Sequence, residues 1–168
     1  MNFPNQLRQE LADRRLARHP FYTAWTEGAL QREQLQHYAE QYFHHVNAFP
    51  RYVSATHSRC EDIRARQVLL ENLRDEEEGA QHHPELWLRF AEGMGCSRES
   101  VRASKPRLET AALVETFFEQ AYDGYATGLG SLFAYEDQVP EVAELKIEAL
   151  SRFYDVQDDR TLEFFRVH

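Results

Sequence analysis

The sequence is poor in the residues that mark turns, disulfide frameworks and nucleic-acid surfaces. Its 168 residues include only seven glycines, six prolines and two cysteines. Cys60 and Cys96 lie far apart without a CxxC spacing, which argues against a disulfide framework and fits a reducing compartment. Lysine and arginine number 19 against 28 aspartates and glutamates, a net charge of −9. Because no basic stripe is present, we expect no nucleic-acid partner.

Long apolar runs are also missing from the sequence. The first twenty residues lack the apolar stretch of a signal peptide, and no uncharged run approaches the length that spans a membrane. The chain has no internal repeat and no linker rich in glycine, serine or proline. We therefore expect one cytoplasmic domain over residues 1–168, without a membrane partner and large enough for a hydrophobic core.

Apolar residues recur at helical spacing over most of the chain, and no strand-like alternation competes with them. The fold class that we expect is all-α, a helical bundle. The expected helices cover residues 4–18, 31–49, 62–83, 108–137, 140–153 and a last segment that ends at 168.

A few residues set the expected boundaries of these helices. Pro50 should kink or restart its helix, whereas Pro140 suits the first turn of another. Asp62 and Thr161 are expected to cap the helices that follow them. We expect the segment 108–137 to form the central helix. The helix that begins at Asp62 is expected to bury Val68, Leu69, Leu70 and Leu73.

An acidic run at 75–78 precedes His82 and His83 on what should be one helix. Seven residues are nearly two turns, so Glu76 and His83 would project from the same face, about 10 Å apart along the axis. Two converging side chains of this kind can share a metal ion. The alternative is a solvated acidic helix face with histidines at its end, and spacing alone favours that alternative.

Other candidate residues are ambiguous when each is taken alone. Glu136 directly follows residues that should face the core, where a carboxylate is costly unless it is paired or coordinated. It could equally belong to an exposed helix end with Asp137. His168 is the final residue and by itself indicates a frayed end. Helical periodicity leaves the direction of Lys146 undecided, and composition does not rank the eight tyrosines.

Six segments along the chain form a recognisable pattern when they are taken together and in order. They are HPFY (19–22), YFHHVNAFPRY (42–52), NLRDEEEG (72–79), ELWLRF (85–90), YEDQVP (135–140) and FFRVH (164–168). Together they resemble the chlamydial death-domain-associating protein family, which belongs to the heme-oxygenase-like di-iron oxidases and includes self-sacrificing 4-aminobenzoate synthases. A looser similarity, at the level of the fold, extends to pyrroloquinoline quinone synthase and thiaminase-like proteins.

The resemblance implies a metal site on a heme-oxygenase-like bundle. Glu76, His83, Glu136 and His168 match the family's first four metal ligands. They would hold two iron ions, or iron plus manganese, with dioxygen as co-substrate. The family places a further carboxylate and histidine beyond the position of His168. The resemblance therefore implies a C-terminally truncated bundle that lacks its last helix and takes up metal weakly.

The resemblance also implies an oxidation of the protein itself that yields 4-aminobenzoate for folate biosynthesis. Tyr22 matches the tyrosine that supplies the ring, Lys146 matches the proposed amino donor, and Tyr135 lies beside a ligand. We expect a homodimer by analogy. Two alternatives stay open: a metal-free oxidase resembling pyrroloquinoline quinone synthase, and a non-catalytic interaction module whose acidic helix face meets a protein partner.

Overall fold

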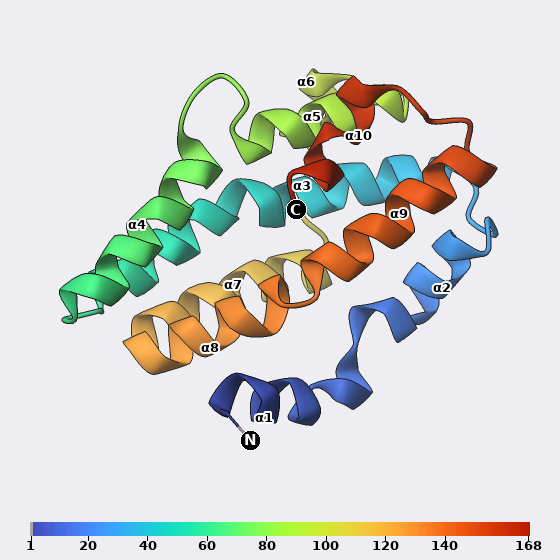
Figure 1. Cartoon of the computed structure of the whole chain (residues 1–168). Coiled ribbons are helices and arrows are strands. Elements are labelled where there is room, and N and C mark those ends of the chain that lie inside the picture. Colours follow the sequence, from blue (N-terminus) through green and yellow to red (C-terminus); the bar gives the residue numbers. More distant parts are fainter. Residues whose placement is uncertain (1) are drawn as a thin grey trace.

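The computed structural model describes residues 2–168 as a bundle of helices, with no β-strand among them. This confirms the predicted all-α class (Figure 1). The longest helix, α3 (Arg32–Ser58), runs through the centre of the bundle. Five helices pack along it: α4 (Ile63–Glu77), α5 (His83–Gly93), α6 (Arg98–Ala103), α7 (Leu108–Asp123) and α8 (Tyr125–Glu136).

The two ends of the chain cover the remaining side of the bundle. Helix α9 (Val139–Phe153) packs against α2 (Pro20–Thr26) and α10 (Asp159–Arg166), and α10 also lies on α5. Helix α1 (Phe3–Glu10) is followed by two short 3-10 turns. Within residues 2–168 no helix is both long and apolar enough to cross a membrane.

The hydrophobic core consists of two clusters that meet along α3. The first half of α3, including Leu35 and Phe43, packs against α5, α9 and α10. The second half, including Phe49 and Tyr52, packs against α4, α7 and α8. Burial of these apolar side chains holds the helices around α3. The candidate site lies where the two clusters meet.

Two predicted helix boundaries near the N-terminus are wrong. Pro50 does not end its helix, because α3 continues to Ser58 with Pro50 buried inside it. An interior proline costs about 3 kcal/mol, and the packing of α3 against five helices offsets that cost. The predicted helix over 4–18 ends at Glu10, since α1 buries no side chain that could stabilise a longer helix.

The predicted helix over 62–83 is wrong at its end, because α4 ends at Glu77 and α5 begins at His83. Its start is confirmed, because the Asp62 carboxylate accepts a hydrogen bond from the backbone N–H of Ala65 at 2.8 Å. The chain then turns after Glu77, and Gly79 adopts φ +81°, a conformation that glycine tolerates best. Pro84 stands in the first turn of α5, a position that suits proline.

The expected burial on α4 is wrong for two of its four residues. Leu69 is buried and Leu73 packs partly on the core, but Val68 is 65% exposed and Leu70 is exposed as well. One narrow stripe of α4 therefore faces α3, since α4 lies at the edge of the bundle (Figure 1).

The segment 108–137 is a pair of helices and not the central one. The chain breaks at Gly124, where α7 and α8 fold back on each other. Near the C-terminus, Asp158 caps α10 by accepting a hydrogen bond from the N–H of Thr161, so Thr161 is not the capping residue. Pro140 lies in the first turn of α9, as predicted.

Candidate active site

Three predicted metal ligands converge in the structure. Glu76 lies in the last turn of α4, His83 opens α5, and His168 follows α10. One possible ligand atom from each lies within 4.8 Å of the other two. His83 Nδ1 is 2.8 Å from Glu76 Oε2, and the rings of His83 and His168 are 4.6 Å apart between centroids.

Glu76 and His83 lie close together, as predicted, but the predicted reason for their proximity was wrong. Glu76 and His83 do not share one helix face, because residues 78–82 separate α4 from α5. The loop through Gly79 joins the two helices, so that the end of α4 meets the start of α5. Two helix ends can bring short side chains closer than two turns of one helix would.

His168 is not a frayed end. Its Nδ1 lies 2.6 Å from the carbonyl oxygen of Phe164. A carbonyl only accepts, so Nδ1 carries the proton and the lone pair of Nε2 stays free. Burial lowers the pKa of His168, which favours the neutral ring that binds metals. A backbone carbonyl that orients an imidazole in this way is typical of metal-binding histidines.

Glu136 faces the same cavity from the end of α8. The cavity measures about 630 Å³, and both glutamates and both histidines line it. Burial, followed by the charge of Glu76, raises the pKa of Glu136 to about 7. Glu136 does not belong to the three-residue group whose donor atoms lie within 4.8 Å.

The donor set fits a divalent cation. Glu76 is buried, and within residues 2–168 neither Glu76 nor Glu136 pairs with a lysine or arginine. Two facing carboxylates in a partly buried cavity repel each other, and a cation would relieve this repulsion. Carboxylate and imidazole ligands on facing helices suit iron or manganese.

Lys146 is buried, which settles the direction that periodicity left open. It is 5% exposed and lies on the inner face of α9, in register with Ala143, Ala149 and Leu150. Its Nζ donates a hydrogen bond to the hydroxyl of Tyr38 at 2.7 Å. Burial lowers the pKa of Lys146 to about 7.

Aromatic rings enclose the amine of Lys146. Nζ lies 5.0 Å from the centroid of the Tyr22 ring and at similar distances from four others. Such faces attract a cation, but the lowered pKa indicates that loss of water around the amine is the larger effect. The other four rings belong to Trp25, Tyr38, Tyr42 and Phe165.

The three candidate catalytic residues line one small cavity of about 20 Å³. Tyr22, Tyr135 and Lys146 are on its walls, and so is His168. The hydroxyl of Tyr135 contacts the hydroxyl of Tyr42, and burial raises the pKa of both phenols. Because Tyr135 and His168 also line the larger cavity, the amine and the metal-ligand candidates share a wall.

Sequence reasoning missed three residues of the site, namely Tyr38, Tyr42 and His45. They continue with Phe49 and Tyr52 along one face of α3, at alternating spacings of four and three residues. That spacing was the signal that could have selected them, because it marks one helix face. Burial lowers the pKa of His45 to about 4, and within residues 2–168 its ring nitrogens have no hydrogen-bond partner.

The sequence of the chain is similar to those of known proteins. Residues 7–168 match the sequence profile of the TENA/THI-4/PQQC family. The chain is similar to the 4-aminobenzoate synthases of Chlamydia muridarum (41% identical) and Nitrosomonas europaea (44%). The alignments cover 100% and 99% of this chain and 72% of each relative. A pyrroloquinoline-quinone synthase of Acinetobacter baumannii is 29% identical over 88% of this chain and 60% of its own length.

A solved structure shares the fold. The TenA homologue protein from P. horikoshii OT3 superposes with a TM-score of 0.75 over 97% of this chain and 75% of that one. At 21% sequence identity, this likeness concerns the fold alone.

Proposed function

This chain belongs to the TENA/THI-4/PQQC family, and we propose that it makes 4-aminobenzoate, the product in the names of its relatives. The observation that carries the proposal is the buried amine of Lys146. It lies beside the ring of Tyr22, on the wall of a cavity that His168 also lines. An aromatic ring, an amine and metal-ligand candidates therefore meet in one place.

We propose that Tyr22 is the source of the ring. The tyrosine side chain and 4-aminobenzoate have the same carbon skeleton, a ring with one carbon attached. The attached carbon, Cβ, would become the carboxylate, which requires the Cα–Cβ bond to break. The phenolic oxygen would be replaced by nitrogen. Burial raises the pKa of Tyr22, so its phenol keeps its proton at neutral pH.

We propose that Lys146 supplies the nitrogen: a bond forms between Nζ and the ring carbon that carried the phenolic oxygen, and that oxygen leaves as water. The Cε–Nζ bond of Lys146 then breaks after oxidation at Cε, which leaves the lysine side chain as an aldehyde. Dioxygen is the oxidant for this step and for the conversion of Cβ to a carboxylate.

Only a neutral amine has the lone pair that forms a carbon–nitrogen bond. With the pKa lowered to about 7, a large fraction of Lys146 is neutral at physiological pH. The hydroxyl of Tyr38 accepts a hydrogen bond from Nζ and holds the amine in place. The surrounding rings exclude water, which protects a reactive ring from hydrolysis.

We propose that Glu76, His83, Glu136 and His168 hold two iron ions, or iron plus manganese. When bound, this metal pair supplies the oxidation of the phenol by dioxygen. Glu76 and Glu136 would balance the charge of the cations, and the Phe164 carbonyl keeps Nε2 of His168 available. The support is the donor set and the raised pKa of Glu136, a carboxyl that has no cationic partner in the described part of the chain.

The experiment is product analysis in matched variants. The chain is loaded anaerobically with Fe²⁺ and Mn²⁺, exposed to air, and assayed for 4-aminobenzoate by mass spectrometry. Tyr22→Phe and Lys146→Met should release none, because each lacks one reacting atom. Tyr122→Phe is the matched control, since Tyr122 is exposed and away from both cavities.

Two outcomes would contradict parts of the proposal. Equal product from Tyr22→Phe and the unaltered chain would show that the ring comes from elsewhere. Product from protein treated with a chelator would favour a metal-free oxidase, the alternative that the resemblance left open.

We also propose that the chain forms a homodimer. The support is apolar surface on α4, where Ile63 is 64% exposed and Val68 is comparably exposed. Sedimentation equilibrium measures the mass in solution, and a monomer at micromolar concentration would contradict the proposal.

A further inference from the structure

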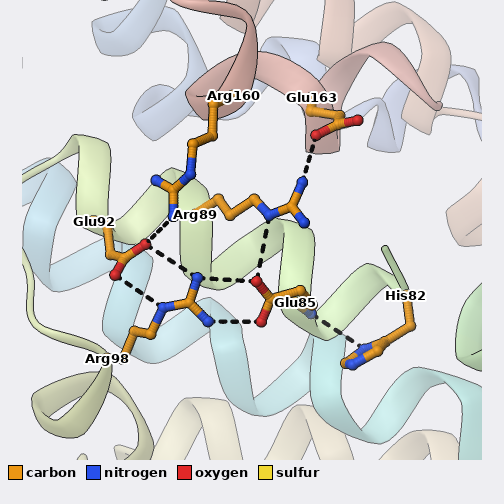
Figure 2. Close-up of polar contacts among 7 residues, drawn as sticks. All are labelled: His82, Glu85, Arg89, Glu92, Arg98, Arg160 and Glu163. Carbon is orange, nitrogen blue, oxygen red and sulfur yellow. Dashed lines mark hydrogen bonds and ion pairs between the residues drawn. The ribbon is translucent and has the colours of Figure 1, made fainter. Parts of the chain in front are cut away.

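Six charged side chains form one network on the outer face of α5 (Figure 2). Arg98 lies between Glu85 and Glu92; its Nη1 is 2.6 Å from Glu85 Oε2, and its Nε is 2.8 Å from Glu92 Oε1. These pairs lower the pKa of Glu85, and they help to lower the pKa of Glu92 to about 2. The network therefore stays ionised over the physiological pH range. Its members are Glu85, Arg89, Glu92, Arg98, Arg160 and Glu163.

Two arms of the network cross from α5 to α10. Arg89 Nη1 is 2.7 Å from Glu163 Oε2, and Arg160 Nη2 is 2.6 Å from Glu92 Oε2. The Arg89 arm is the better shielded one, because its side chains are 16% and 32% exposed, whereas Arg160 is 55% exposed. A more exposed ion pair is screened more strongly by water and salt. The pair Arg89–Glu163 is therefore the stronger tie.

The two helices that these ion pairs join lie next to the candidate metal-binding histidines, because α5 begins with His83 and His168 follows α10. Glu85 comes two residues after His83, and Glu163 comes five residues before His168. The backbone N–H of Glu85 also donates a hydrogen bond to His82, the residue that caps α5 just before His83. A shift of α10 along α5 would move His168 away from His83.

Apolar packing does not by itself fix this register. Phe164 and Phe165 of α10 pack on Trp87, and Phe165 also packs on Phe90. These contacts hold α10 on α5, but hydrophobic attraction is non-directional. A charge-assisted hydrogen bond is directional and loses strength steeply when its geometry changes. The ion pair between Arg89 and Glu163 therefore favours one position of α10 along α5.

We propose that the ion pair between Arg89 and Glu163 is a positioning device that sets the separation of His83 and His168 for binding a divalent cation. The inference rests on the proposed metal site and adds two residues that are not among its candidate ligands. Arg89 and Glu163 act through the two helices, so they are positioning residues. Their loss should change cation affinity more than it changes the stability of the bundle.

The test is a Mn²⁺ titration, followed by electron paramagnetic resonance, of chelator-treated protein. Glu163→Gln should bind Mn²⁺ roughly tenfold more weakly, the lower end of the usual effect of residues behind metal ligands. Glu163→Asp keeps the charge but shortens the side chain, so it should weaken binding similarly. The matched control is Asp159→Asn, which removes a carboxylate from the same helix. Among residues 2–168, Asp159 pairs only with Arg166 of α10, and it is 88% exposed.

Equal Mn²⁺ affinity in Glu163→Gln and Asp159→Asn would overturn the proposal. So would a Glu163→Asp variant that binds like the unaltered chain, because charge alone would then explain the effect. Thermal unfolding of each variant checks that all remain folded at the titration temperature. Should Glu163→Gln unfold there, Arg89→Met breaks the same arm from α5 and replaces it in the comparison.

A metal-free readout separates this proposal from the metal site itself. The nuclear Overhauser effect between the ring protons of His83 and His168 reports their proximity without any cation. It should weaken in Glu163→Gln and persist in Asp159→Asn. If the unaltered chain bound no Mn²⁺ but this signal still depended on Glu163, the metal proposal would fail and the positioning role would stand. If the unaltered chain bound Mn²⁺ but Glu163→Gln changed neither the Mn²⁺ affinity nor the nuclear Overhauser effect, the metal proposal would stand and the positioning role would fail.

Discussion

Replacing Lys146 with methionine should stabilise the metal-free protein at acidic pH. Methionine has a similar length and no charge, so the variant fills the same space without an amine to desolvate. The pKa of Lys146 falls from 10.5 to about 7. At about 1.4 kcal/mol per pKa unit, the charged amine costs about 5 kcal/mol in the folded state. The variant also leaves the hydroxyl of Tyr38 without its donor, a loss of about 1–3 kcal/mol. The net gain in the free energy of unfolding at pH 6 should be about 2–4 kcal/mol.

The pH dependence of this gain has a defined sign. Because the folded-state pKa is the lower one, the unfolded chain binds more protons than the folded chain between about pH 7 and 10.5. The contribution of Lys146 to stability therefore rises with pH in that window, and it is flat below pH 7. From pH 6 to pH 9 the unaltered chain should recover about 2–3 kcal/mol that Lys146→Met has no means to recover.

Urea denaturation followed by circular dichroism at pH 6 and pH 9 measures both effects. Lys105→Met is the matched control, since Lys105 is exposed and its side chain forms no ion pair within residues 2–168. All other titrating groups are common to the variants, so their pH dependence cancels in the comparison. A Lys146→Met variant that is less stable at both pH values, with an unchanged pH dependence, would refute the reasoning that the amine is desolvated.

Two further predictions concern stability, and urea denaturation measures each of them. Glu136→Gln should stabilise the metal-free chain above pH 7, because the unaltered chain loses stability as pH rises from about 4.5 to about 7; the same variant should bind Mn²⁺ more weakly, and weaker binding without stabilisation would contradict the burial of Glu136. Gly128→Ala should destabilise by about 1–3 kcal/mol, since its Cβ would meet the side chain of Thr56. Gly130→Ala in the same helix meets nothing within 4 Å and should stabilise by up to about 1 kcal/mol; equal effects of the two changes would contradict the packing of α8 against α3.

Local sequence signals predicted which segments are helical, but they predicted less well where one helix ends and the next begins. Asp62 and Pro140 predicted helix starts correctly, because capping and first-turn preferences depend on a few neighbouring residues. The prediction that Pro50 interrupts its helix was wrong, because the packing of α3 against its neighbours outweighs the cost of a proline inside a helix. Gly79 and Gly124 interrupt segments whose apolar pattern continues across them, and periodicity alone does not register such turns.

Part of the candidate site was named from the sequence, but Tyr38, Tyr42 and His45 were missed and the geometry was not predicted. Spacing alone favoured a solvated face for Glu76 and His83 and left Lys146 undecided, and the resemblance to a family selected all three. Their convergence depends on how α4, α5 and α9 pack, which sequence periodicity does not encode. The burial of Lys146 could have been inferred from the inner-face positions of Ala143 and Leu150. The spacing of the aromatic residues on α3 was visible in the sequence. Only the structure shows that two of them, Tyr38 and Tyr42, lie against the amine of Lys146.

Peptide mass spectrometry shows whether the protein converts its own tyrosine into 4-aminobenzoate, as we propose. The chain is produced with ring-labelled tyrosine, loaded with Fe²⁺ and Mn²⁺, exposed to air and digested. We expect labelled 4-aminobenzoate together with an equal amount of peptide that has lost the side chain of Tyr22. Labelled product released while every tyrosine-containing peptide stayed intact, or unlabelled product, would show that Tyr22 is not the source of the ring.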